Sequence, residues 1–365
     1  LWLLGAGACS SSGGPSGGAD VDELGDVVAE EDSGRDGSED DAAAPGVVRV
    51  ASFNSALSRD AEGQLADDLA GGGDAAAKRV AEIVQRVRPD VVLLNEFDWD
   101  AEGKSARIFA EQYLAVSQDG EEAIAYPHRY VPETNTGVHS GVDLDNNGKA
   151  VSTPGSQQYG NDAFGFGVYP GQYGMVIYSR HPVAEESVRS FRKLRWKSMP
   201  ENLVPEGYYS DEAQQVLRLS SKNHVDVPVR VGGETLHILA SHPTPPSFDG
   251  PEDRNGRRNH DEIHFWADYL SGGDEASYIR DDAGGRGGLD SDAVFVVLGD
   301  LNSDPKDGDS RHGAVRELLN HSRIRDPRPS SEGALEAAES DGGANASHEG
   351  DPGLARAALG GDAYD

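Results

Sequence analysis

The chain has 365 residues, which suits one large domain or two small ones. Lys and Arg total 32 against 64 Asp and Glu, so the net charge is −32, and such a surface repels nucleic acids and anionic membranes at long range. A phosphate-bearing substrate would therefore have to meet a metal ion or a local group of basic side chains. Cys9 is the single cysteine of the chain, which excludes an intrachain disulfide.

Residues 1–9 are a short run of apolar and small residues that ends at Cys9, and a Ser/Gly stretch follows. This pattern is typical of the end of a secretory signal peptide, and the run is too short to span a bilayer. Small residues before a cysteine, with a Ser/Gly tether after it, resemble the processing site of a bacterial lipoprotein. We therefore expect a protein outside the cytoplasm, tethered to a membrane by a lipid on Cys9. The alternative is an ordinary secretory signal with an incidental cysteine.

Residues 10–45 are mainly Gly, Ser, Asp, Glu and Ala. Such a segment cannot bury enough apolar area to offset the entropy of ordering it, so we predict a disordered acidic linker. The folded domain is expected over residues 46–365. No internal repeat divides it.

The predicted elements alternate between strands and helices. A strand over residues 47–53 is followed by a helix over 75–88, whose apolar residues recur at helical spacing and which Pro89 ends. The next strand, 90–96, is almost uniformly apolar, as expected when both faces are covered. Further strands are expected at 173–179, 235–242 and 293–300, a helix at 259–270, and a Gly/Asp-rich loop at 272–292. This mixture predicts an α/β protein with a buried sheet.

The buried strands end in polar residues: Asn54, Glu96, His242 and Asp300. Function in such folds gathers at strand ends and in the loops beyond them. Carboxylate and amide oxygens suit Mg²⁺, Mn²⁺ or Ca²⁺, and no thiolate or paired histidine indicates zinc. In the Gly-Asp-x-Asn turn, the Asp300 carboxylate can orient water or take a proton from it, and the Asn302 amide can donate to a phosphate oxygen. A simple polar turn is the alternative.

The ordered set of motifs resembles the endonuclease/exonuclease/phosphatase superfamily. The set comprises Asn54 after a strand, Leu94-Asn95-Glu96, the segment 173–182, a strand ending in His242, and Gly-Asp-Leu-Asn-Ser-Asp-Pro at 299–305. The resemblance covers about residues 47–365 and implies a deoxyribonuclease I-like fold, a four-layer α/β/β/α sandwich. The segments 241–246 and 249–259 resemble, more narrowly, a secreted bacterial branch of the superfamily.

The resemblance also implies a role for each matching residue. Glu96 matches the acid that binds the catalytic divalent ion, and Asn54 matches the amide beside that ion. His242 matches the histidine that contacts phosphate or donates a proton. Asp300 and Asn302 match the pair that orients the attacking water and stabilises the transition state.

The sequence departs from the superfamily pattern at its C-terminal end. The pattern ends in an Asp-bearing strand and a Ser-Asp-His segment, and neither follows Asn302. His348-Glu349 is not a substitute, because no apolar strand precedes it. We therefore expect a domain that is truncated at the C-terminus. This departure keeps a catalytically inactive, lipid-tethered binding module open as an alternative to an enzyme.

Two further groups of residues are candidate binding sites. Asp143, Asp145 and Asn147 place oxygen ligands at alternate positions before Gly148, as in a calcium loop, although the twelfth position is Pro154 instead of Glu. A polar surface turn is the alternative. Three arginines that follow the His242 strand could reach a substrate phosphate or pair with nearby acids: Arg254, Arg257 and Arg258.

The sequence therefore predicts an extracytoplasmic phosphoric ester hydrolase that uses Mg²⁺ or Mn²⁺. A nuclease-like phosphodiesterase, with nucleic acid as its partner, is preferred within that class. The alternatives are a phospholipid-headgroup phosphodiesterase, a phosphatase, or the inactive binding module.

Overall fold

A computed structural model describes the backbone of residues 2–6 together with residues 47–328, 330, 332, 335–336 and 349–351. Cys9, the predicted linker 10–45 and His348 lie outside the described residues. Among the described residues, no helix combines the length and the hydropathy needed to cross a membrane.

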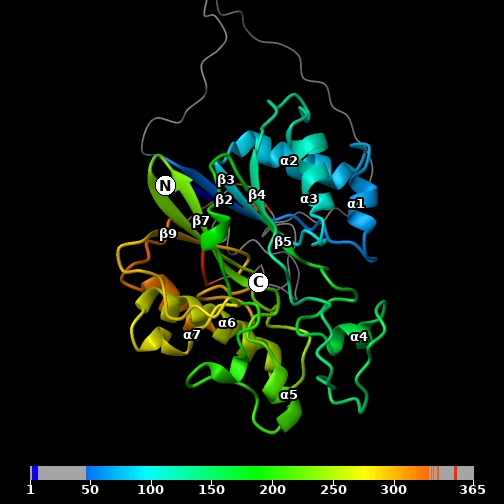
Figure 1. Cartoon of the computed structure of the whole chain (residues 1–365), viewed down its shortest axis with the longest axis vertical. Coiled ribbons are helices and arrows are strands. Elements are labelled where there is room, and N and C mark those ends of the chain that lie inside the picture. Colours follow the sequence, from blue (N-terminus) through cyan, green and yellow to red (C-terminus); the bar gives the residue numbers. More distant parts are fainter. Residues whose placement is uncertain are drawn as a thin grey trace, which may run out of the picture.

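Two mixed sheets form the centre of the fold (Figure 1). The five-stranded sheet has the order β1 (Trp2–Ala6), β2 (Arg49–Asn54), β3 (Val91–Asn95), β5 (Met175–Ser179) and β4 (His128–Tyr130). β2 runs parallel to β1 and β3, whereas β5 runs antiparallel to β3 and β4. The backbone of β1 belongs to the segment predicted as a signal-peptide remnant, and it pairs here along the edge of β2.

The four-stranded sheet has the order β6 (Arg189–Ser190), β7 (His224–Val231), β8 (Glu234–Ser241) and β9 (Val294–Leu298). β8 runs antiparallel to β7 and parallel to β9. Gly232 and Gly233, both with positive φ, close the β7–β8 hairpin. The parallel strands β8 and β9 therefore end at one edge of the sheet, and β7 begins there.

Helices cover the outer face of each sheet, so the molecule has four layers (Figure 1). On the five-stranded sheet lie α1 (Gln64–Leu69), α2 (Ala75–Val87), α3 (Lys104–Phe109) and the π-helical turn Ala110–Leu114. On the four-stranded sheet lie α6 (Arg254–Ser271) and α7 (His312–Asn320). Shorter elements complete the described part: α4 (Gln157–Asn161), α5 (Asp211–Val216) and the 3₁₀ turns Glu185–Ser187, Trp196–Ser198 and Glu275–Tyr278.

Side chains alternate between the two faces of each apolar strand, and the buried apolar residues form three hydrophobic clusters. In β3, Val91 and Leu93 point into the core between the sheets, while Val92 and Leu94 point into the core beneath α2. Full burial of each such side chain contributes about 1.5–3 kcal/mol. The uniformly apolar run therefore reflects a strand that is covered on both sides. The predicted four-layer α/β/β/α sandwich is confirmed.

Helix α6 begins at Arg254, although the apolar periodicity predicted a start at residue 259. Its first turn is polar, and the Asp249 carboxylate accepts a hydrogen bond from the backbone N–H of Asn255 at 2.6 Å. Hydrophobic periodicity cannot detect such a turn, because it has no apolar face and is stabilised by a hydrogen bond to a side chain outside the helix.

Candidate active site at the strand ends

The two sheets meet at the edge where β2, β3, β8 and β9 end, and we call this edge the rim. Asn95, the last residue of β3, joins the sheets there. Its side-chain amide donates to the backbone carbonyl of Ser241 at 3.5 Å, and its Oδ1 accepts from the backbone N–H of Asp300 at 3.2 Å. Because Ser241 ends β8 and Asp300 follows β9, one buried side chain holds three strand ends together.

Gly299 allows β9 to end close enough to β8 for this arrangement. A Cβ atom on Gly299 would lie 2.0 Å from the backbone oxygen of Ser241, which is far inside contact distance. Its φ of 153° also lies in a region that residues with side chains rarely adopt. The glycine of the Gly-Asp-Leu-Asn motif is thus required by packing, and it places Asp300 at the rim.

Asn54 bridges the two carboxylates of the rim. Its Nδ2 donates to Glu96 Oε1 at 3.2 Å and to Asp300 Oδ2 at 2.9 Å. The Asn54 Oδ1 accepts from the N–H of Ala56 at 3.2 Å, which orients the amide. Glu96 follows β3 in a left-handed conformation, with φ of 55°. The structure therefore brings together three of the residues that the sequence singled out.

His242 lies beside Asp300 and is deeply buried, with 2% of its surface exposed. Its Nε2 lies 3.8 Å from Asp300 Oδ2, and its Nδ1 has no hydrogen-bond partner within the described part of the chain. Burial lowers the pKa of the imidazole well below its usual value, and the charge of Lys222 lowers that pKa further. The ring is therefore neutral at pH 7 and carries one N–H for donation.

Asn302 is held between Asp300 and the loop after His242. Its backbone N–H donates to Asp300 Oδ1 at 3.1 Å, and its Nδ2 donates to the carbonyl of Pro243 at 3.1 Å. An amide nitrogen carries two hydrogens, so this bond leaves a second one for another acceptor. The predicted donation to a phosphate oxygen therefore remains chemically feasible, and it stays a prediction.

The carboxylates of the rim suit a hard divalent cation. Burial raises the pKa of both Glu96 and Asp300, while the hydrogen bond from Asn54 and the charge of Lys222 lower both values. Because both pKa values stay raised, Lys222 compensates the two carboxylates only in part, and a divalent ion would supply further positive charge. Carboxylate and amide oxygens are also the ligands that Mg²⁺ and Mn²⁺ prefer. The residues present therefore fit the metal that the sequence predicted.

Lys222 is a residue of the rim that the sequence analysis missed. It precedes β7, and His224 pairs with Ser241, so the start of β7 reaches the edge where β8 ends. Its Nζ donates to the carbonyl of Pro243 at 3.3 Å, and the residue is 6% exposed. Burial lowers the pKa of this ammonium, whereas Glu262, Glu96 and Asp300 raise it. The apolar alternation of β7 was the available signal, since it predicts a strand that begins just after Lys222.

The arginines after the His242 strand contact the protein itself. Arg254 pairs with Glu252, and the Nε of Arg257 donates to the Glu252 carbonyl at 3.0 Å. Arg258 is buried and donates to three backbone carbonyls, those of Leu219, Phe164 and Arg218. These bonds give Arg258 a structural function, and phosphate contact by the three arginines stays a prediction.

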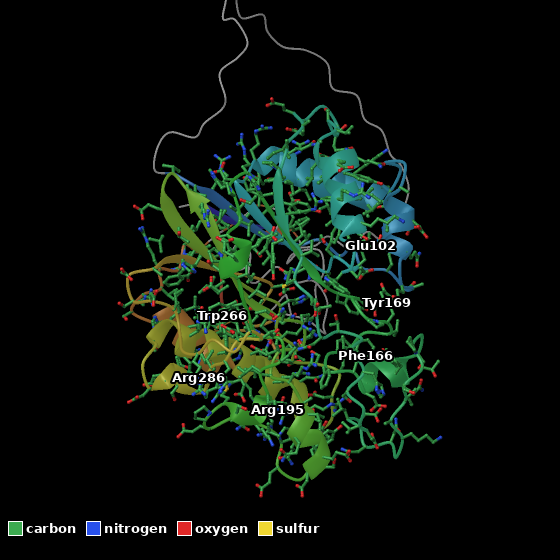
Figure 2. The ribbon with its side chains drawn as sticks, viewed as in Figure 1. Glu102, Phe166, Tyr169, Arg195, Trp266 and Arg286 are labelled. Carbon is green, nitrogen blue, oxygen red and sulfur yellow. The ribbon has the colours of Figure 1, made fainter. Side chains whose placement is uncertain are left out.

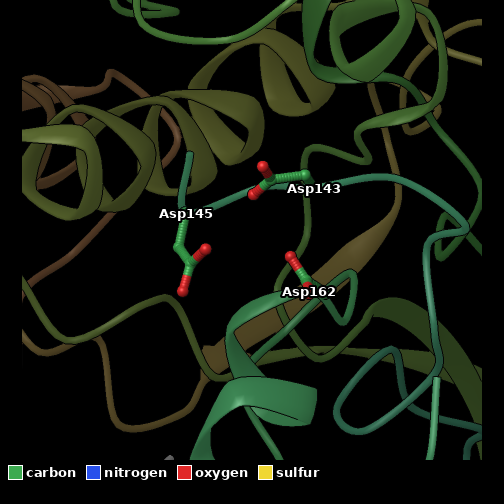
Figure 3. Close-up of side chains that lie close together, drawn as sticks. All are labelled: Asp143, Asp145 and Asp162. Atoms are coloured by element: carbon green, nitrogen blue, oxygen red, sulfur yellow. The ribbon is translucent and has the colours of Figure 1, made fainter. Parts of the chain in front are cut away.

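The predicted calcium loop forms an acidic cluster composed of Asp143, Asp145 and Asp162 (Figure 3). One carboxylate oxygen from each lies within 4.8 Å of the others. Asp162, which the sequence analysis missed, accepts from the N–H groups of Leu144 and Val151, both at 2.8 Å. The predicted ligand Asn147 instead accepts from its own loop, from the Lys149 N–H at 3.0 Å. Calcium binding stays a prediction.

The sequence profile of the Endonuclease/Exonuclease/phosphatase family matches residues 51–358. The chain belongs to this family. Proteins of the family are usually phosphoester hydrolases and typically depend on a divalent metal, and the fold of this member is that of a phosphoesterase.

Solved structures of the same fold resemble this family member at low identity. The first is an endonuclease/exonuclease/phosphatase from Beutenbergia cavernae, with 22% identity over 74% of this chain, 53% of that chain and a TM-score of 0.40. This chain therefore spans about half the length of that relative. Sphingomyelinase C from Streptomyces griseocarneus follows with 15% identity over 76% of this chain and 70% of that one, at a TM-score of 0.38.

A beta toxin variant from Staphylococcus aureus, whose structure contains bound magnesium ions, has 13% identity over 76% of this chain and 71% of its own, at a TM-score of 0.38. No curated protein matches the sequence.

Proposed function

We propose that this family member is a divalent-metal-dependent phosphodiester hydrolase whose site is the rim. The observation that carries the proposal is the bridge from Asn54 to Glu96 and Asp300, beside a buried ammonium at Lys222. Two carboxylates, an amide and a cation converge from four separate stretches of the chain. Such a set can bind a hard cation, activate water and meet the charge of a phosphate.

Each residue of the rim has a chemical task in this proposal. Glu96 would hold the cation, which when bound offsets charge on the non-bridging phosphate oxygens. Asn54 orients both carboxylates through its Nδ2, and it would join the cation as a ligand only by turning its amide oxygen toward them. Asp300 orients a water molecule and accepts its proton, and a raised carboxyl pKa makes it a better proton acceptor. The neutral His242 and the amide of Asn302 donate hydrogen bonds as charge develops on the phosphate. Lys222 supplies the fixed positive charge of the described site.

Nuclease-like action on a nucleic-acid phosphodiester is the first substrate class of this proposal. A phospholipid headgroup is a second candidate, and the net charge of −32 favours it, because a zwitterionic headgroup avoids the repulsion that a polyanion meets. We also propose that the protein works outside the cytoplasm, tethered by a lipid on Cys9, which implies that processing before Cys9 removes the edge strand β1 from the mature protein. The small residues before Cys9 and the Ser/Gly stretch after it support this location.

The test measures turnover of bis(4-nitrophenyl) phosphate, a short oligonucleotide and phosphatidylcholine vesicles by the same preparation. EDTA should abolish turnover, and Mg²⁺ or Mn²⁺ should restore it. Glu96→Gln should lose turnover by a factor of about 10² or more, while Glu102→Gln, an exposed acid that Figure 2 labels, should keep it.

Turnover that persists in EDTA, or a Glu96→Gln variant with an unchanged rate, contradicts the proposal. Tight binding of a phosphodiester without turnover, with and without metal, indicates the binding module instead.

A further inference from the structure

Helix α6 places two buried polar side chains directly behind the rim. Glu262 is 0% exposed, and its two carboxylate oxygens accept hydrogen bonds from the backbone N–H groups of Ser221 and Thr244, both at 2.6 Å. Ser221 immediately precedes Lys222, and Thr244 lies two residues after His242. A single carboxylate therefore connects the loop that leads into β7 with the loop that leaves β8.

Asn259 lies one helical turn before Glu262 and connects the same region to the end of β9. Its Nδ2 donates toward the carbonyls of Thr244 at 2.9 Å, Leu301 at 2.9 Å and Asn302 at 3.2 Å. The side chain is fully buried. Asn259 thus joins the His242 loop to the turn that carries Asp300 and Asn302.

We propose that Asn259 and Glu262 are positioning residues for the reaction at the rim: they fix the relative placement of the loops that carry Lys222, His242 and Asn302. This inference rests on the proposed function, because it assigns the two residues a task in that reaction. Three loops from different parts of the sequence depend on two side chains of one helix. Catalytic groups must be held close to their productive geometry, and a displacement of about 1 Å can cost about 10²-fold in rate.

The rest of α6 makes this placement rigid. Trp266, on the same helix (Figure 2), donates from its indole nitrogen to Ser241 Oγ at 2.9 Å, next to His242. Its side chain is fully buried in the core between α6 and the four-stranded sheet. Apolar packing therefore fixes the position of the helix, and the hydrogen bonds of Asn259 and Glu262 fix the rim loops relative to it.

Asp261 offers a matched control on the same helix. It is 2% exposed, and its Oδ2 accepts from the Trp196 indole and from the backbone N–H of Leu203, both at 2.6 Å. These partners lie outside the rim loops. Asp261→Asn and Glu262→Gln therefore remove the same kind of buried acceptor, but only the second change acts on the loops of the rim.

The experiment compares Glu262→Gln, Asn259→Ala and Asp261→Asn in the full chain, at a temperature where all are folded. We expect kcat for bis(4-nitrophenyl) phosphate to fall about 10- to 100-fold in the first two variants, more than KM rises, and to stay within about twofold in the third. Amide hydrogen exchange should accelerate at Ser221 and Thr244 in Glu262→Gln, and at Leu203 in Asp261→Asn. If Glu262→Gln does not fold, Asn259→Ala still tests the proposal.

Three results would overturn the inference. Unchanged exchange at Ser221 and Thr244 in Glu262→Gln shows that the carboxylate does not hold the loops. Faster exchange with a kcat equal to that of the wild type, or equal losses of kcat in the variant and in the Asp261→Asn control, shows that the reaction does not depend on this contact. Turnover by the wild type tests the proposed function separately. Hydrogen exchange measures the stability of the loops whether or not the protein turns over a substrate.

Discussion

Lys222→Met tests the rim most directly, because it removes the buried ammonium and keeps an unbranched side chain of similar length. The ammonium donates to the Pro243 carbonyl at 3.3 Å and lies among the carboxylates of Glu262, Glu96 and Asp300. If Lys222 faces the charge that develops on the phosphate, its loss removes one preorganised donor. Such a donor contributes about 10²–10³ in kcat, or about 2.7–4 kcal/mol of transition-state stabilisation.

The same substitution also predicts a change in pH dependence. Lys222 lowers the pKa of Glu96 and of Asp300, so both pKa values should rise further when the ammonium is absent. The proposed mechanism needs Asp300 as a carboxylate, and turnover is lost as pH falls through the pKa of that group. The acid limb of kcat/KM should therefore move to higher pH in Lys222→Met.

The assay follows turnover of bis(4-nitrophenyl) phosphate from pH 4 to 9 for the wild type, Lys222→Met and Lys193→Met. Lys193 is exposed, so its substitution makes the same change in net charge away from the rim. We expect the control to match the wild type in rate and in pH profile. A Lys222→Met enzyme with a kcat within about twofold of the wild type and an unmoved acid limb would refute the reasoning.

Four further predictions concern single positions. Asp300→Asn should lower kcat about 10²–10³-fold while the melting temperature stays within a few degrees; unfolding instead would assign Asp300 a structural role. Cys9→Ser should move the protein from the membrane fraction to the medium, and equal partitioning of both forms would contradict lipidation. Ca²⁺ should raise the melting temperature of the wild type by a few degrees and that of Asp145→Asn by less, whereas equal rises would exclude Asp145 as a ligand. Burial lowers the pKa of His224 to about 4 from an unfolded value near 6.5. The stability that this buried histidine contributes above pH 6.5 is therefore lost as pH falls through 4, by about 3 kcal/mol, and urea unfolding of His224→Gln should show a smaller loss over that range.

The residues of the rim that could be predicted from the sequence are those marked by a local pattern. Apolar strands are short runs that can be recognised one at a time, and the polar residue after each run is Asn54, Glu96, His242 or Asp300. Because parallel strands end at one edge of a sheet, these four residues had to converge within each sheet. The structure joins the two sheets at that edge through Asn95, a buried residue that the sequence presents only as part of a strand.

The residues behind the rim could not be predicted, because their function depends on distant contacts. Glu262 bonds to Ser221, and Asn259 bonds to Leu301 and Asn302, across separations of about 40 residues. In the sequence, both lie in a polar first half of a helix and are typical of a solvated face. Burial of that face follows from the loops that cover it, and helical periodicity carries no information on those loops.

Charge connects the composition of the chain to the chemistry of the rim. At physiological salt the Debye length is about 8 Å, so charges at the rim act on an incoming phosphate more strongly than the bulk of the −32 net charge. At the rim, the charge of Lys222 is outnumbered by the carboxylates of Glu96 and Asp300, and His242 is neutral. The local electrostatic field therefore favours binding of a cation. Once a divalent ion offsets the negative charge of the carboxylates, an anionic phosphoester can bind there. A substrate with a single phosphodiester meets only this local requirement, whereas a long polyanion also meets the repulsion of the whole surface.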